Sequence, residues 1–234
     1  YNIEKLRVYS LVLSDNYEAR KGTFETPMQF LTITSIPDGA DVYLDNKLVG
    51  TSDNFSLKLE VKSYTYRLEK HLYHPESGTI TLKPDETYNL PVKLRPNFGY
   101  VNITTSPESG AQVEIDGQPL EGLTPIRSDK LQSGTHKARI KKLMYKTKPV
   151  EFEIKDEQTT PLNIELEPIF AEITIEATNN ADIFIDDIRK GSSSVTERLI
   201  EGMHTFEAKK DNYTPDNKQF VVTAGQAQTF SLNV

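Results

Sequence analysis

The chain of 234 residues carries a net charge of −7, has no cysteine and is 36% hydrophobic. The lack of cysteine excludes disulfides, thiolate metal ligands and a cysteine nucleophile, and the absence of a strongly basic segment argues against nucleic acid as a partner. No apolar run approaches the roughly 20 residues that a transmembrane helix needs.

Residues 1–30 differ in pattern from everything that follows. Leu6–Leu13 predicts a strand and Asp15–Gly22 predicts a turn. Two interpretations remain open, an added edge strand or the remnant of an upstream module. The first residue is Tyr1 rather than Met, so a signal peptide or lipid anchor ahead of it also stays open.

The rest of the chain consists of three similar segments. Three landmarks recur with a period of about 70 residues: an Ala, an Asp five residues later, and a Tyr towards the end of the segment. We therefore expect three domains, at residues 31–96, 97–168 and 169–234. The landmarks are Ala40, Asp45 and Tyr73; Ala111, Asp116 and Tyr145; and Ala181, Asp186 and Tyr213.

Each segment has the pattern of short strands. In the first segment Leu31, Ile33 and Ser35 alternate with polar residues, which is typical of a half-buried strand. Asp116-Gly117 supplies the positive-φ residues of a tight hairpin turn. Later strands are predicted at Phe55–Val61, Tyr64–Lys70, Thr79–Leu82 and Tyr88–Leu94; at Lys137–Lys142, Val150–Ile154 and Leu162–Leu166; and at Thr205–Lys209, Lys218–Val222 and Thr229–Asn233.

The predicted fold class is all-β. Six or seven short strands per segment, with turn signals every 8–12 residues, indicate three tandem small antiparallel β-sandwich domains. Pro96-Asn97-Phe98 and Pro168-Ile169-Phe170 mark the joints. Proline stiffens such a joint, so we expect an extended, semi-rigid arrangement in which each Phe packs between neighbouring domains.

The repeated segments resemble the PEGA domain family, named for a Pro-Glu-Gly-Ala signature. Pro37–Ala40 matches three of its four positions, and Pro107–Ala111 matches with one inserted Ser. Gly122–Pro125 matches the family's Gly-x-Thr-Pro element, and in the third segment Asn180 stands where Gly would supply a left-handed backbone. The resemblance covers residues 31–234.

The resemblance implies small β-sandwiches, often in tandem, in envelope proteins of bacteria and archaea, without a common enzymatic activity. The sequence is also similar in style to exported or lipid-anchored proteins of the Bacteroidetes. The resemblance therefore implies a location in the periplasm or on the cell surface.

Two groups of side chains are candidate metal ligands. His71 and His74 would reach one ion only if the chain turns between them, and a polar loop is the alternative. Asp182, Asp186 and Asp187 would offer carboxylates to calcium, but hairpin turns favour Asp for backbone reasons. We predict no metal site from either group.

Two further groups are candidate binding surfaces. Lys137, Arg139 and Lys141 alternate along one strand and would suit an anionic glycan or lipid headgroup, unless they form a solvated face mixed with acidic residues. Tyrosines without any Trp would stack on sugars or simply pack on the sheet. These tyrosines are Tyr43, Tyr64, Tyr66 and Tyr100.

No catalytic constellation is visible in the sequence. There are four histidines, and Gly-x-Ser-x-Gly and phosphate-binding glycine loops are missing. We predict no catalytic residue and no cofactor. The leading hypothesis is a non-catalytic envelope protein that acts as a spacer and protein-docking rod. The alternatives are an array of carbohydrate-binding modules and accessory domains cut from a larger enzyme or sensor.

Overall fold

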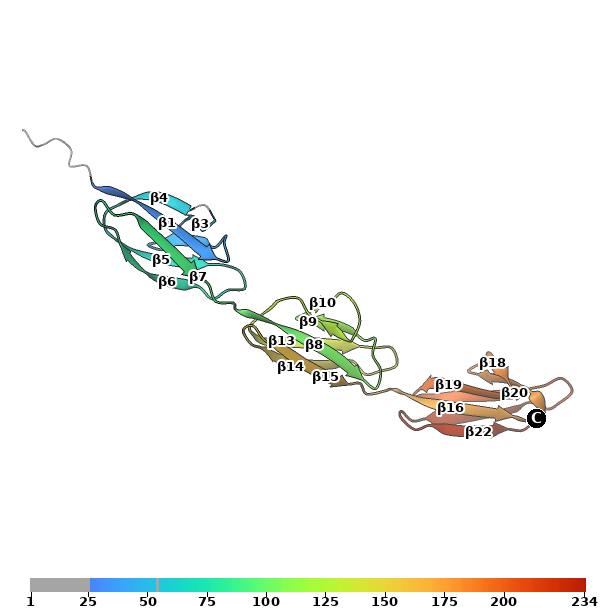
Figure 1. Cartoon of the computed structure of the whole chain (residues 1–234). Coiled ribbons are helices and arrows are strands. Elements are labelled where there is room, and N and C mark those ends of the chain that lie inside the picture. Colours follow the sequence, from blue (N-terminus) through green and yellow to red (C-terminus); the bar gives the residue numbers. More distant parts are fainter. Residues whose placement is uncertain (1–25, 54) are drawn as a thin grey trace, which may run out of the picture. The chain divides into compact units, whose positions relative to one another are not determined.

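The computed structural model describes residues 26–53 and 55–234 as an all-β chain, which confirms the predicted fold class (Figure 1). The predicted strand Leu6–Leu13 and the turn Asp15–Gly22 lie outside the described residues. The chain divides into two compact units, one that ends at Asn97 and one that spans Phe98–Val234. No helix in the described part is long and apolar enough to cross a membrane.

The first repeat is a sandwich of a three-stranded and a four-stranded sheet, with strand orders β4-β1-β7 and β3-β2-β5-β6. The expected alternation is observed, because Leu31, Ile33, Val42 and Leu44 all point into the core. Strand β1 begins at Met28, so the repeat includes three residues that the sequence left in the N-terminal segment. The strands are β1 (Met28–Ile36), β2 (Asp41–Leu44), β3 (Lys47–Thr51), β4 (Phe55–Glu60), β5 (Ser63–Glu69), β6 (Glu76–Thr81) and β7 (Tyr88–Lys93).

The second repeat has the same arrangement, with a four-stranded sheet β10-β9-β13-β14 and a second sheet around β8. The antiparallel neighbour of β8 is split into β11 and β12. Between these two strands the side-chain hydroxyl of Ser128 accepts the backbone N–H of Val101 at 3.0 Å. The strands are β8 (Phe98–Ser106), β9 (Gln112–Ile115), β10 (Gln118–Pro119), β11 (Ile126–Arg127), β12 (Leu131–Gln132), β13 (Gly134–Lys141), β14 (Lys148–Ile154) and β15 (Thr159–Glu165).

The third repeat shares this strand order, with sheets β19-β16-β22 and β18-β17-β20-β21. Three phenylalanines, Phe206, Phe220 and Phe230, pack on one another with ring centroids 4.0–5.4 Å apart. The elements are β16 (Phe170–Ala177), a short 3-10 turn (Thr178–Asn180), β17 (Asp182–Ile185), β18 (Ile188–Ser192), β19 (Ser194–Ile200), β20 (Gly202–Lys209), β21 (Asp216–Val222) and β22 (Gln228–Leu232).

The antiparallel pairing predicted from the sequence applies to every strand pair except one in each repeat. The first and last strands run parallel in the pairs β1–β7, β8–β15 and β16–β22. Parallel neighbours need a crossover connection. Here the crossover is the four-stranded sheet itself, because the strand before the last one belongs to that sheet.

The recurring aspartate has two roles. Asp45, Asp116 and Asp186 each begin a hairpin turn with positive φ, and so does the residue that follows each of them. Each Asp side chain also accepts a backbone N–H from the adjoining strand at 2.9 Å. The sequence predicted the turn, and the structure adds this tie to β5, β13 and β20.

Candidate functional site

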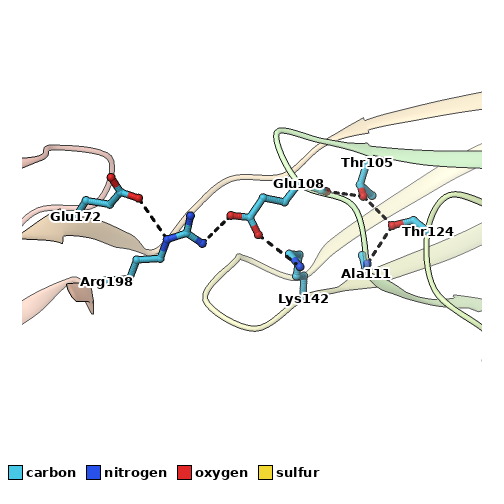
Figure 2. A network of polar contacts seen from close by, with 7 residues as sticks. All are labelled: Thr105, Glu108, Ala111, Thr124, Lys142, Glu172 and Arg198. Atoms are coloured by element: carbon cyan, nitrogen blue, oxygen red, sulfur yellow. Dashed lines mark hydrogen bonds and ion pairs between the residues drawn. The ribbon is translucent and has the colours of Figure 1, made fainter. Parts of the chain in front are cut away.

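The two family signatures meet in a chain of hydrogen bonds in the second repeat (Figure 2). The N–H of Ala111 donates to Thr124 Oγ1 at 3.0 Å, and the two hydroxyls of Thr124 and Thr105 lie 2.7 Å apart. Thr105 Oγ1 donates to the carbonyl of Glu108 at 2.7 Å. Since a hydroxyl has one proton, the proton of Thr124 must point at Thr105. The Thr of the Gly-x-Thr-Pro element therefore holds the Pro-Glu-Gly-Ala loop closed.

The first repeat has the same chain of bonds made by serines. Ala40 N–H donates to Ser52 Oγ at 2.8 Å, and Ser35 and Ser52 hydroxyls lie 2.6 Å apart. In the third repeat the N–H of Ala181 donates instead to the carbonyl of Thr178 at 3.1 Å, within its own turn. The third repeat thus closes the equivalent loop without the buried hydroxyl pair.

The joint between the second and third repeats, residues 166–170, is hydrogen-bonded along its backbone. The N–H of Lys146 donates to the Glu167 carbonyl at 2.9 Å, and the N–H of Ile169 donates to Met144 at 2.9 Å. On the other side the N–H of Glu201 donates to the Ile169 carbonyl at 2.7 Å. Both repeats therefore hold the joint.

Phe170 belongs to both repeats of this unit. It begins β16 of the third repeat, but its side chain is 8% exposed and packs in the core cluster of the second repeat. Its ring meets Tyr145 edge-on with centroids 5.5 Å apart, and the Arg198 guanidinium lies 4.8 Å from its centroid. The sequence predicted that this Phe would pack between domains, and Phe170 does so.

Arg198, which lies over the Phe170 ring, is the centre of an ion-pair network (Figure 2). Arg198 donates to Glu108 of the second repeat at 2.6 Å and to Glu172 of its own repeat at 3.4 Å, while Lys142 lies 3.5 Å from Glu108. The hydrogen bond from Arg198, with a further one from Tyr145, lowers the pKa of Glu108. Burial and this bond to Glu108 raise the pKa of Tyr145. The junction is thus an apolar contact with a charged rim.

The sequence did not predict that Arg198, Glu108 and Glu172 meet, although Glu108 is part of the Pro107–Ala111 signature. They come from segments up to 90 residues apart, and only the docking of the third repeat on the second joins them. The one available signal was the position of Phe170 after Pro168, which indicated a joint but not its partners.

The structure does not bring the candidate metal ligands together. No group of three or more His, Asp or Glu side chains suited to a metal occurs in residues 26–53 and 55–234. Asp182 instead pairs with Arg189 at 2.8 Å, and Asp186 accepts hydrogen bonds from Thr205 and His204. The turn aspartates serve the backbone and nearby side chains.

The basic strand is interleaved with acidic side chains. Lys137 pairs with Glu151 at 3.2 Å, Arg139 lies 3.8 Å from Glu114, and Lys141 also bonds Glu114. These partners come from β9 and β14 on either side of β13. The three cations form a mixed-charge face, as the second of the two interpretations predicted.

The four candidate tyrosines do not form an array of open aromatic faces, and Tyr66 is partly buried against the core cluster of the first repeat. Tyr64 is buried and donates its hydroxyl to the Glu60 carbonyl at 3.1 Å. Arg67 covers the ring of Tyr43, with the guanidinium carbon 4.1 Å from the ring centroid. Arg127 covers Tyr100 in the same way at 4.0 Å. Sugar stacking on these rings would have to displace or share a guanidinium.

The sequence also did not predict the contacts of two histidines, one in the second repeat and one in the third. His204 places Nδ1 2.7 Å from Asp186 and Nε2 2.8 Å from the Ile200 carbonyl, and His136 is held in the same way by Asp116 and Gln132. Burial opposes the charged form of His204, but the bonds to Asp186 and Ile200 raise its pKa above the ordinary value. The available signal in the sequence was the spacing from the turn aspartate, which is 20 residues for His136 and 18 residues for His204.

Solved structures similar to the chain share little sequence with it. One is the TIE protein of Bacillus anthracis, 15% identical over 89% of the chain with a TM-score of 0.37. The chain spans about half of that protein, 50% of its length. The major pilin subunit of Bacillus cereus is 11% identical over 89% of this chain and 98% of that one, with a TM-score of 0.26.

A third similar structure is SGBP-B of the mixed-linkage glucan utilization locus of Bacteroides ovatus, solved with a mixed-linkage heptasaccharide. It is 10% identical over 91% of this chain and 70% of that one, with a TM-score of 0.17. No curated protein matches the chain in sequence.

The PEGA domain profile matches residues 28–97 and 98–169, which are the first two repeats. These ranges hold both hydroxyl chains that link the Pro-Glu-Gly-Ala loop to the Gly-x-Thr-Pro position. The profile does not reach the third repeat, whose loop lacks that hydroxyl pair. With more than half of its residues matched, this chain belongs to the PEGA domain family.

Proposed function

We propose that the chain is a non-catalytic structural protein of the bacterial cell envelope, whose tandem sandwiches act as a spacer and as a docking surface for another envelope protein. In this proposal the domains are residues 31–96, 97–168 and 169–234, with the first extended to Met28. The third repeat is a diverged PEGA domain, since its strand order equals that of the other two.

The observation that carries the proposal is the junction around Phe170. A flexible linker would leave its backbone groups to water, whereas residues 167–170 bond to both repeats. The Phe170 side chain adds an apolar anchor, and Arg198 bridges Glu108 and Glu172 around it. A fixed joint is what a spacer needs, because it transmits position from one domain to the next.

Export to the periplasm or cell surface and an origin in the Bacteroidetes belong to the same proposal. They rest on the style of the sequence and on the family.

The test is cross-linking of a tagged copy on intact cells of the source organism, followed by mass spectrometry. Recurrent capture of one or two envelope proteins, with cross-links on defined strands or loops, would support docking. Retention of the tag on cell-wall or capsule glycan without a protein partner would overturn it in favour of a carbohydrate-binding array. A chain found joined to a catalytic domain would favour the accessory-domain alternative.

A further inference from the structure

The outer face of the first repeat's four-stranded sheet is hollowed over β5 and β6. The hollow has a volume of about 410 Å³. Thr65 and Arg67 alternate with the buried Tyr64 and Leu68, so they point away from the core. The residues that line the hollow are Asn46, Thr65, Tyr66, Arg67, Ser77, Gly78 and Thr79, and of these Tyr66 is partly buried and packs against the core cluster.

The same face of the second repeat shows why the hollow exists. Thr65 and Lys137 are equivalent, since each donates its backbone N–H to the recurring turn aspartate. Thr65 pairs with Thr79 across β5 and β6, and Lys137 pairs with Glu151 across β13 and β14. In the second repeat this pair is a 3.2 Å ion pair of two long side chains. In the first repeat two short hydroxyl side chains leave the space open.

The polar groups around the hollow are arranged as donors and acceptors without net charge. Thr65 Oγ1 donates to Asp45 at 3.1 Å, so its lone pairs face outward, and the hydroxyls of Ser77 and Thr79 both donate and accept. The Arg67 guanidinium carbon lies over the Tyr43 ring, 4.1 Å from its centroid, and the charge is balanced by an ion pair with Glu69. A guanidinium fixed in this way presents a preoriented set of N–H donors.

A ligand that fits this lining must be uncharged and must itself carry many hydroxyls. We propose that the hollow on the first repeat binds a neutral glycan, recognised by hydrogen bonds to Thr65, Ser77 and Thr79 and by the Arg67 fork. Arg67 covers one face of Tyr43 and Tyr66 packs against the core, so hydrogen bonds rather than ring stacking orient the sugar. The site belongs to the first repeat alone and does not depend on the proposed docking function.

The test transplants the ion pair of the second repeat into the hollow. Thr65→Lys with Thr79→Glu fills the space with the residues that the fold already carries at this place in the second repeat. The matched control is Thr32→Lys with Ser56→Glu, an exposed cross-strand hydroxyl pair on the other sheet of the same repeat. Circular dichroism confirms that both variants are folded.

The full chain and both variants are applied to immobilised neutral oligosaccharides, β-glucan and mannan hexasaccharides among them, and the retained sugar is titrated by calorimetry. We expect the transplanted pair to weaken binding at least about tenfold and the control pair to leave it unchanged. Retention of no neutral sugar by the unmodified chain overturns the proposal. So does equal binding by the transplanted variant, or binding of anionic glycans only.

Discussion

At the residue scale, the family signature has a physical meaning in this chain. Thr124 is 3% exposed and its hydroxyl serves two partners, the Ala111 N–H and the Thr105 hydroxyl. Aligned hydroxyls of this kind polarise one another, and a buried N–H without an acceptor is costly. The threonine is therefore required for its oxygen rather than for its shape.

Thr124→Val keeps the shape and removes the oxygen. We expect the free energy of unfolding of the second repeat to fall by about 1–3 kcal/mol, because the buried Ala111 N–H loses its acceptor. Urea denaturation measures this. The control is Thr104→Val. The Thr104 hydroxyl is exposed, so its loss is expected to change the free energy of unfolding by less than about 0.5 kcal/mol. Equal effects of the two substitutions would contradict the role of Thr124.

We expect His204 to make the stability of the third repeat depend on pH. Its two ring nitrogens face the Asp186 carboxylate and the Ile200 carbonyl, both acceptors, so the ring needs both protons. Its pKa is raised in the folded state, so this stabilisation is complete below the ordinary value of about 6.5 and is lost as the pH rises through the raised pKa. We expect an NMR titration to place the His204 pKa above that ordinary value.

The first repeat provides the control for this prediction. The Tyr64 hydroxyl donates to the carbonyl four residues earlier, and His204 Nε2 bonds to the carbonyl of Ile200, also four residues earlier. His204→Tyr should keep that bond and remove the loss of stability as the pH rises through the raised pKa. A His204 pKa at or below the ordinary value would show that burial, which favours the neutral ring, outweighs the two acceptors.

At the element scale, β16 contributes side chains to the cores of two repeats. Ile173 and Ile175 fill the core of the third repeat, while Phe170 at its start fills that of the second. A strand that serves two cores couples them, because neither can open without disturbing the other. This shared strand joins the second and third repeats into one unit.

Phe170→Ala should remove this coupling. We expect the second repeat to lose about 3 kcal/mol, the usual cost of emptying a large buried site, and the unfolding of the second and third repeats to separate into two transitions. Denaturant unfolding followed by hydrogen exchange resolves them. Phe30→Ala is the control, since Phe30 is 57% exposed and should cost less than about 0.5 kcal/mol. An unchanged single transition would contradict the coupling.

At the scale of the whole molecule, the repeat boundary in sequence differs from the boundary of the packed core. The predicted second domain ends at residue 168, yet its core includes Phe170. Repeat proteins gain part of their stability from such nearest-neighbour contacts. A second domain that ends at residue 168 would therefore lack Phe170, a side chain of its own core.

Two truncations test this boundary. A chain that ends at Pro168 should have a second repeat less stable by a few kcal/mol than the same repeat in the full chain, since the Phe170 site stays empty. A chain that ends at Glu172 restores the aromatic ring and should recover part of the loss. Thermal melts of both chains make the comparison. Equal stability of the two would mean that Phe170 does not stabilise the second repeat.

The sequence by itself determined the features that depend on local chemistry. The alternation of Leu31, Ile33 and Ser35 requires a half-buried strand, and Asp116-Gly117 requires a tight turn. Asn180 has a φ of 56°, as predicted for the position that Gly occupies in the other repeats. Repetition of these local signals at a constant period was enough to reveal the all-β class.

Only the tertiary structure decided the features that join distant segments. The parallel pairing of first and last strands, the Arg198–Glu108 bridge and the contact of His204 with Asp186 unite residues 18–90 positions apart. The hollow at Thr65 and Thr79 likewise depends on cross-strand register, which places two short side chains opposite each other. Local propensity does not predict such pairings, because they form only when the sheets pack and the whole core fixes the register of the strands.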